Sequence, residues 1–198
     1  MLINYYGHSY FLITGDSYSI ALDPFSNIGL PEKVVKADYV FCSHNHYDHN
    51  NVNLTSNAKL IDKSENGFEI INTYHDEVKG AKRGLNNVLK FVVDGNTCVF
   101  MGDIGVIDKN VIEKTKGCDY LFIPVGGTYT IDYKEAKRYV EEIKPKVVIP
   151  MHYKLEGCTV DVDKIDKFLN EFENIKVVNS PYVANGNEKN ILVIKAEL

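Results

Sequence analysis

The densest group of metal-ligating side chains lies at residues 44–49, which read HNHYDH. Residues two apart on an extended chain point the same way, so His44 and His46 are placed to bind one ion. Asp48 and His49 lie where the chain is expected to turn and are placed to bind a second ion beside it. Imidazole and carboxylate ligands without a thiolate suit zinc, manganese or iron. The pattern therefore predicts a metal site.

Two more histidines and one aspartate lie beside apolar runs further along the chain. His75 follows FEIINTY, Asp103 lies in FMGDIG and His152 lies in VVIPMHY. The runs predict β-strands. Ligands at the ends of several strands can meet at one edge of a sheet.

The elements that must position these residues differ between the two halves of the chain. Strands are expected in the first half at 10–14, 18–22, 37–42, 68–74, 87–93 and 97–101, and the first two and the last two of them are expected to form hairpins. The second half alternates helical and strand patterns. Helices are expected at 109–116, 132–143 and 161–172, and strands at 120–124, 147–150, 176–178 and 191–195.

The amino-acid composition indicates which class of protein the chain belongs to. The chain has 198 residues, 44% of them hydrophobic, with 22 Lys and Arg against 27 Asp and Glu, a net charge of −5. These values are typical of a globular protein and lack the basic footprint of non-specific nucleic-acid binding. The four cysteines form no CxxC pair, so free thiols are expected. No apolar run approaches a membrane span, and the first residues read as a strand rather than a signal peptide.

The HxHxDH motif after an apolar strand resembles the first metal motif of the metallo-β-lactamase fold. The flanking segments GHSYFLI, ALDPF, RGLNN and PVGGTYT resemble the branch of L-ascorbate 6-phosphate lactonases and uncharacterised metal-dependent hydrolases. The resemblance covers nearly the whole chain. It implies an α/β fold over a single domain, residues 1–198: a four-layer αββα sandwich of two mixed sheets with helices outside.

The resemblance also implies two divalent ions, zinc in the first place, with manganese or iron as alternatives. The family's ligands map onto seven residues in two sets joined by one carboxylate: His44, His46 and His75; Asp48, His49 and His152; and Asp103 between them. Asp48 and Asp103 would be the catalytic carboxylates. Two ions would lower the pKa of a bridging water, so that hydroxide attacks a lactone or a phosphodiester.

A further set of residues is expected near the substrate: His8, Arg83, Asn86 and Tyr129. His8 is expected near the mouth of the site, where it would contact substrate or shuttle a proton. An arginine beside a metal centre suits a phosphate or carboxylate group. Asp23 is expected to orient a ligand imidazole by accepting its second N–H.

Two other functions fit the same residues. One is an iron-dependent oxidoreductase of the sulfur dioxygenase kind, although the full second ligand set argues against a mononuclear iron. The other is a metal-stabilised binding protein without activity. The expected partner is a small-molecule substrate, with no nucleic acid and no membrane. A homo-oligomer and a cytoplasmic location are also expected.

Overall fold

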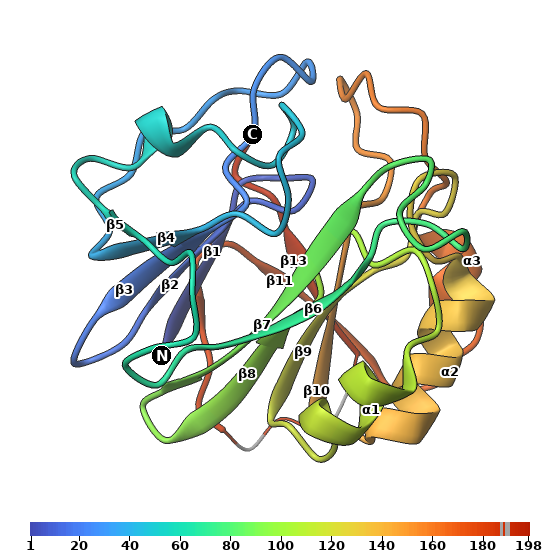
Figure 1. The fold of residues 1–198 in the computed structure, drawn as a ribbon. Helices are drawn as coiled ribbons and strands as arrows, with labels where there is room; N and C mark the ends of the chain where they lie inside the picture. Colours follow the sequence, from blue (N-terminus) through green and yellow to red (C-terminus); the bar gives the residue numbers. More distant parts are fainter. Residues whose placement is uncertain (187, 189–190) are drawn as a thin grey trace.

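The computed structural model describes residues 1–186, 188 and 191–198. Two β-sheets lie face to face, and the chain builds them largely in order (Figure 1). The first sheet uses the N-terminal strands, and the second uses most of the remainder. A late strand, β12 (Tyr182–Val183), returns to the first sheet and pairs with β1 (Leu2–Tyr5).

The first sheet has six strands in the order β12-β1-β2-β3-β4-β5. Its other members are β2 (Phe11–Thr14), β3 (Ser19–Leu22), β4 (Tyr39–Phe41) and β5 (Lys59–Leu60). Strands β1, β2 and β3 are antiparallel neighbours, whereas β3, β4 and β5 run parallel. Strands β1, β3 and β4 therefore end at the same edge of this sheet.

The second sheet has seven strands in the order β11-β13-β10-β9-β8-β7-β6. Their bounds are β6 (Glu69–Tyr74), β7 (Leu85–Val93), β8 (Asn96–Phe100), β9 (Tyr120–Pro124), β10 (Val147–Met151), β11 (Ile175–Asn179) and β13 (Ile191–Lys195). Strands β8, β9 and β10 are parallel, and β6 runs the same way because two antiparallel steps separate it from β8. Every residue of β9 and β10 is buried, as is typical of central parallel strands covered on both faces.

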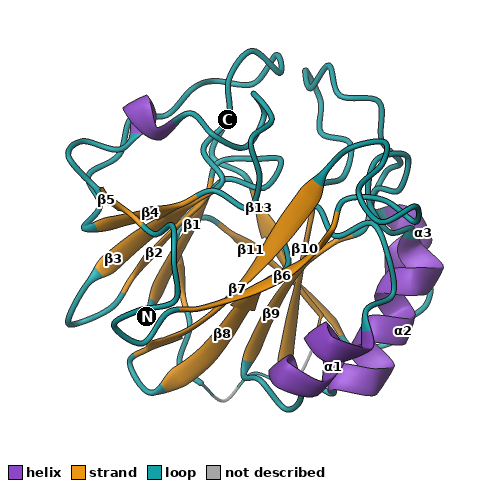
Figure 2. Cartoon of the chain, in the orientation of Figure 1, coloured by secondary structure: helices purple, strands orange, loops and turns teal. Residues whose placement is uncertain are grey.

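The α-helices cover the outer face of the second sheet (Figure 2). They are α1 (Lys109–Thr115), α2 (Tyr133–Ile143) and α3 (Asp166–Leu169). On the first sheet the outer layer consists of loops with one 3₁₀ turn at Val52–Leu54, and Phe25, Ile28 and Leu54 pack there. Pro24, Pro31 and Gly29 interrupt that segment and disfavour a helix. The predicted α/β sandwich of two mixed sheets is confirmed, with α-helices on one outer face among the described residues.

The main core lies between the sheets. Alternate residues of β1 and β2 point inward, including Ile3, Phe11 and Ile13, and all three are fully buried. Phe11 meets Phe122 of β9 edge to face, with ring centroids 5.0 Å apart. Such aromatic contacts couple the two sheets and fix the distance between their edges.

Most of the expected elements are present, with ends shifted by one or two residues. The helix predicted at 161–172 was wrong in extent, because only Asp166–Leu169 is α-helical. Val160 and Val162 are buried among loop residues, and the backbone of Asp163 hydrogen-bonds to Gly126 and Lys154. These tertiary contacts hold residues 160–163 extended. The two-residue strands β5 and β12 were not predicted.

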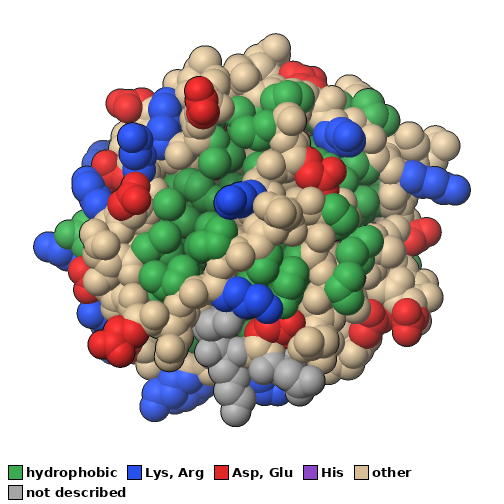
Figure 3. All heavy atoms as spheres, turned by 180° about the vertical axis from the view of Figure 1, so that it is seen from behind, with side chains coloured by type: hydrophobic (Ala, Val, Ile, Leu, Met, Phe, Trp, Pro, Cys, Tyr) green, Lys and Arg blue, Asp and Glu red, His purple; other side chains and the backbone are tan. Residues whose placement is uncertain are grey.

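The surface opposite the view of Figure 1 carries acidic and basic side chains interspersed around hydrophobic patches (Figure 3). No histidine is visible on that face among the described residues. Within the same described part of the chain, no helix has the length and apolar content needed to cross a membrane.

Helix α2 begins with a capping box that provides a test of the fold. The Asp132 carboxylate accepts hydrogen bonds from the backbone N–H groups of Lys134 and Glu135, and the Glu135 carboxylate accepts one from Asp132 N–H. We expect Asp132→Ala to lower the free energy of unfolding by about 1 kcal/mol in urea denaturation, whereas Asp132→Asn retains most of it. Equal stability of the alanine variant and the wild type would contradict the assigned cap.

Candidate metal centre

The candidate ligands lie where strands of both sheets end. His44 and His46 follow β4, His75 follows β6, Asp103 follows β8 and His152 follows β10. These strands share one direction within each sheet, so their carboxyl ends bring the following loops to one opening between the sheets. All six histidines of the chain gather there, His8 from the β1–β2 turn among them. The sequence prediction of ligands at strand ends matches their placement.

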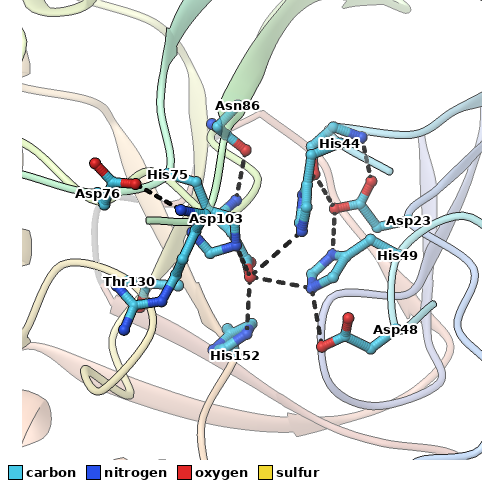
Figure 4. Close-up of polar contacts among 12 residues, drawn as sticks. Asp23, His44, Asp48, His49, His75, Asp76, Asn86, Asp103, Thr130 and His152 are labelled. Atoms are coloured by element: carbon cyan, nitrogen blue, oxygen red, sulfur yellow. Dashed lines mark hydrogen bonds and ion pairs between the residues drawn. The ribbon is translucent and has the colours of Figure 1, made fainter. Parts of the chain in front are cut away.

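The Asp103 carboxylate is at the centre of the cluster (Figure 4). It is 2% exposed, and its Oδ2 atom faces four imidazole nitrogens. The distances from Oδ2 to Nε2 are 3.1 Å for His152, 3.2 Å for His49, 3.4 Å for His75 and 3.9 Å for His44. Asp103 thus touches histidines from both predicted ligand sets.

The other ligand atoms fall into two groups on either side of Asp103. His44, His46 and His75 form one group, and Asp48, His49 and His152 form the other together with His8. Within each group the donor atoms lie within 4.8 Å of one another. The two groups contain the residues of the two ligand sets that the family resemblance implies, with His8 as an addition to the second, and a third possible group joins Asp23, His44 and His49.

Asp23, at the end of β3, orients two of the imidazoles. One carboxylate oxygen accepts hydrogen bonds from His49 Nδ1 at 2.7 Å and from Ser43 Oγ at 2.6 Å. Ser43 Oγ in turn lies 2.9 Å from His44 Nδ1 and accepts its proton. With Nδ1 protonated, both His44 and His49 present an unprotonated Nε2 toward Asp103. Asp23 therefore has the role predicted for it.

The histidines of the site differ in protonation, because the pKa is lowered for His44 and His8 but raised for His49. Burial lowers the pKa of His44 to about 2 and that of His8 to about 3, so both rings are neutral imidazoles. Burial also opposes charge on His49, but the Asp103 and Asp23 carboxylates outweigh it and raise the pKa of His49 well above its usual range. A proton on His49 and a metal cation would thus compete for the same place between two buried carboxylates.

Several buried polar atoms of the site lack a hydrogen-bond partner among the described residues. They include His44 Nε2, His152 Nε2 and Asp103 Oδ1. Leaving such atoms unpaired costs free energy, and lone pairs that face one another attract a cation. The residues therefore fit divalent metal ions.

Two glycines let the ligand loops approach one another closely. A Cβ atom on Gly105 would lie 2.4 Å from the carbonyl carbon of His75, and one on Gly126 would lie 2.1 Å from the His152 carbonyl oxygen. Any larger residue would push these backbones apart. The glycines thus contribute to the position of two ligands without touching the metal site.

A cavity of about 640 Å³ opens onto the ligands. Its walls include His46, His75 and Asp103 on one side and Arg83 with Tyr129 on another. The Arg83 guanidinium lies 5.5 Å from the centre of the Tyr129 ring and donates to the Thr128 carbonyl oxygen at 3.2 Å. The cavity is large enough for a small organic molecule.

A buried aspartate shapes the loop that presents Arg83. The Asp76 carboxylate accepts hydrogen bonds from four backbone N–H groups, including those of Gly80 at 2.8 Å and Arg83 at 2.7 Å. Asp76 directly follows the ligand His75. One carboxylate therefore orders the whole segment between a metal ligand and the cavity arginine.

The predicted substrate residues separate into two kinds. Arg83 and Tyr129 line the cavity, as expected. His8, however, is 1% exposed, and its ring lies against those of His49 and His152 rather than at the mouth. Asn86 is also fully buried, and its amide is occupied by Met101 O and Asp103 N–H, so it holds the Asp103 loop instead of facing substrate.

Sequence reasoning missed Asp76, Ser43 and the cavity residues Tyr47, Thr159 and Asp161. For Asp76 a signal was present, because an aspartate that precedes a glycine-containing turn often accepts backbone N–H groups. The other four residues belong to the site only because loops that are far apart in the sequence come together in the fold.

The chain is similar to known proteins over most of its length. Residues 2–152 match the family described as "Beta-lactamase superfamily domain". A metal-dependent hydrolase of Nanoarchaeum equitans is 30% identical, covering 77% of this chain and 84% of that protein. A metal-dependent hydrolase of Staphylothermus marinus is 29% identical, covering 89% and 94%. A crystal structure from Thermotoga maritima, described as a candidate Zn-dependent hydrolase of the metallo-β-lactamase superfamily, has 31% identity and a TM-score of 0.81 over 99% of both chains.

The network of Asp23 allows a test of ligand orientation. We expect Asp23→Asn to weaken metal binding about 10- to 100-fold, because the amide cannot accept from Ser43 and His49 as the carboxylate does. Asp38→Asn is the matched control, since Asp38 accepts from Ser19 N and Oγ in the same way but at an exposed position. Metal affinity is measured by chelator competition, with the unfolding midpoint as a check of folding. The same affinity in both variants would contradict the orienting role.

Proposed function

The chain belongs to the metallo-β-lactamase superfamily and is a metal-dependent hydrolase, and from this premise we propose that it uses two divalent metal ions to hydrolyse a small ester-type substrate. The bond cleaved is that of a lactone or a phosphodiester. Zinc is the proposed metal, because imidazole and carboxylate ligands suit it.

One observation carries the proposal of two ions. The Asp103 Oδ2 atom lies between two separate groups of ligand atoms and within 3.4 Å of histidines of both, His75 in one and His49 and His152 in the other. A carboxylate in that place is suited to bridge two cations. Each group has at least three possible ligands of its own.

Bound divalent ions would supply hydroxide near neutral pH and stabilise negative charge that develops on the substrate. The protein's own residues then have defined tasks. Asp48 and Asp103 both line the cavity, where their carboxylates would orient the attacking water. Asp23 and Asn86 keep the surrounding ligands in place.

Arg83 favours an anionic substrate. Its guanidinium is held beside the cavity by Tyr129 and Thr128, while the backbone of Arg83 is fixed by Asp76. A positioned guanidinium binds phosphate or carboxylate through paired hydrogen bonds. The substrate therefore combines a hydrolysable ester with a negatively charged group.

Other properties expected from the sequence stay predictions. These are a small molecule as the partner rather than nucleic acid or a membrane, a cytoplasmic location and a homo-oligomeric state. The cavity supports a small-molecule substrate by its size.

Metal content is the direct test of the proposed function. Inductively coupled plasma mass spectrometry on protein purified without chelator should find about two ions per chain, as a dinuclear hydrolase requires. His46→Ala and Asp103→Ala should lose metal and hydrolysis of a panel of lactones and phosphodiesters. Asp38→Ala is the control, because Asp38 is an exposed aspartate outside both the cavity and the ligand groups. A wild type without metal even after reconstitution, or with metal but inert toward the whole panel, would refute the proposal.

The role of Arg83 is tested with a pair of substrates that differ only in charge. We expect Arg83→Met to lower kcat/KM for the anionic ester about 10- to 100-fold, the loss of one or two charge-assisted hydrogen bonds, and to leave the neutral ester nearly unaffected. Metal content should stay unchanged. Lys82→Met removes the neighbouring exposed cation as a control. An equal loss for both esters would contradict recognition of charge by Arg83.

A further inference from the structure

His8 lies in an unusual backbone position for a residue that follows a strand. It sits in the turn between β1 and β2 with a φ of 53°, in the left-handed region that few non-glycine residues adopt. His152, on the other sheet, has a φ of 54°. The His8 carbonyl oxygen accepts hydrogen bonds from His152 N–H at 2.8 Å and from Tyr5 Oη at 3.0 Å. The turn is thus locked to the loop that carries a ligand.

The His8 side chain points into the second ligand group. Its Nε2 atom is 3.1 Å from His49 Nε2 and 3.3 Å from Asp48 Oδ2. Its ring lies against that of His152, with centroids 4.2 Å apart. All four residues present a donor atom within 4.8 Å of the others.

The contact between His8 and His49 needs a chemical reason. His49 Nδ1 donates to Asp23, so when the His49 ring is neutral its Nε2 carries a lone pair. The atoms around that lone pair are the oxygens of Asp48 and Asp103 and the nitrogen of His8. Carboxylate oxygens and imidazole lone pairs converge in this way around a cation. His8 Nδ1 has no hydrogen-bond partner among the described residues, so hydrogen bonding at that end does not account for the ring's place.

We propose that His8 is a metal ligand, so that the second position binds its ion through four side chains, His8, Asp48, His49 and His152, in addition to Asp103. The first position has three histidines and Asp103. This proposal depends on the proposed function, because both require that the second group of residues binds a metal ion.

Two consequences separate the positions. His8, His49 and His152 are each at most 1% exposed, whereas His46 of the first position is exposed at the cavity. The second position would therefore hold its ion more tightly and through more side chains than the first. The first position releases its ion more readily and faces the substrate.

Titration of the metal-free protein with Co²⁺ tests the assignment independently of activity. In the wild type the first equivalent should bind more tightly and give the weak visible absorption of a five- or six-coordinate ion. His8→Ala should weaken this binding about 10- to 100-fold, the scale set by loss of a group that supports a metal site. His46→Ala should weaken only the second equivalent. Unchanged binding in His8→Ala would overturn the proposal.

His8→Gln separates a ligand from a hydrogen-bond donor. The glutamine amide can donate to Asp48 in place of the imidazole Nε2–H, but it is a poor metal ligand. We expect His8→Gln to behave like His8→Ala. Restored Co²⁺ affinity and spectrum would show that His8 only positions Asp48, and would overturn the proposal.

A measurement on the wild type removes any dependence on folding of the variants. With one equivalent of ¹¹³Cd²⁺ and ¹⁵N-labelled histidine, the His8 Nε2 resonance should show a one-bond coupling to cadmium. Coupling from His49 and His152 without His8 would overturn the proposal while leaving two metal ions intact. Metal bound as described here, with no hydrolysis of any ester, would refute the proposed function alone.

Discussion

A buried carboxylate among four imidazoles is the constraint on which the site depends. The Asp103 carboxylate is buried. Burying a charge costs free energy unless polar partners surround it. Those partners come from loops after β4, β6 and β10, so both sheets must meet at one edge. The inward aromatic residues, such as Phe11 and Phe122, set how closely the sheets approach. Packing between the sheets and the chemistry at their edge are therefore linked.

Three buried polar side chains convert this general arrangement into a defined geometry. Asp23 orients His44 and His49, Asn86 holds the backbone of Asp103, and Asp76 orders the loop after His75. Each acts on a different loop, and each has its hydrogen-bonding capacity directed at protein groups. A site supported in this way is pre-organised, because the ligands need little rearrangement when an ion binds.

The sequence predicted the parts of this arrangement that local pattern controls. The HNHYDH segment was identifiable because ligand chemistry and spacing are local, whereas His75, Asp103 and His152 were assigned as ligands through the resemblance to the metallo-β-lactamase fold. The helix at 161–172 was overestimated because burial of Val160 and Val162 under distant loops overrides helical spacing. The burial of His8 and the occupied amide of Asn86 depend on residues far away in the chain, such as His152 and Met101. Hydrophobic periodicity along the sequence does not reveal contacts between residues that are so far apart in the chain.

The lock between the His8 turn and the His152 loop has a kinetic consequence. The second ligand group takes His8 from the turn between the first two strands and His152 from the loop after β10, about three quarters of the way along the chain. The group is therefore complete only when nearly the whole chain is ordered. The complete group of His8, Asp48, His49 and His152 therefore forms late in folding, when the β1–β2 turn meets the loop after β10. An ion bound there would be held less tightly whenever the β1–β2 turn opens, because opening removes His8 from the group.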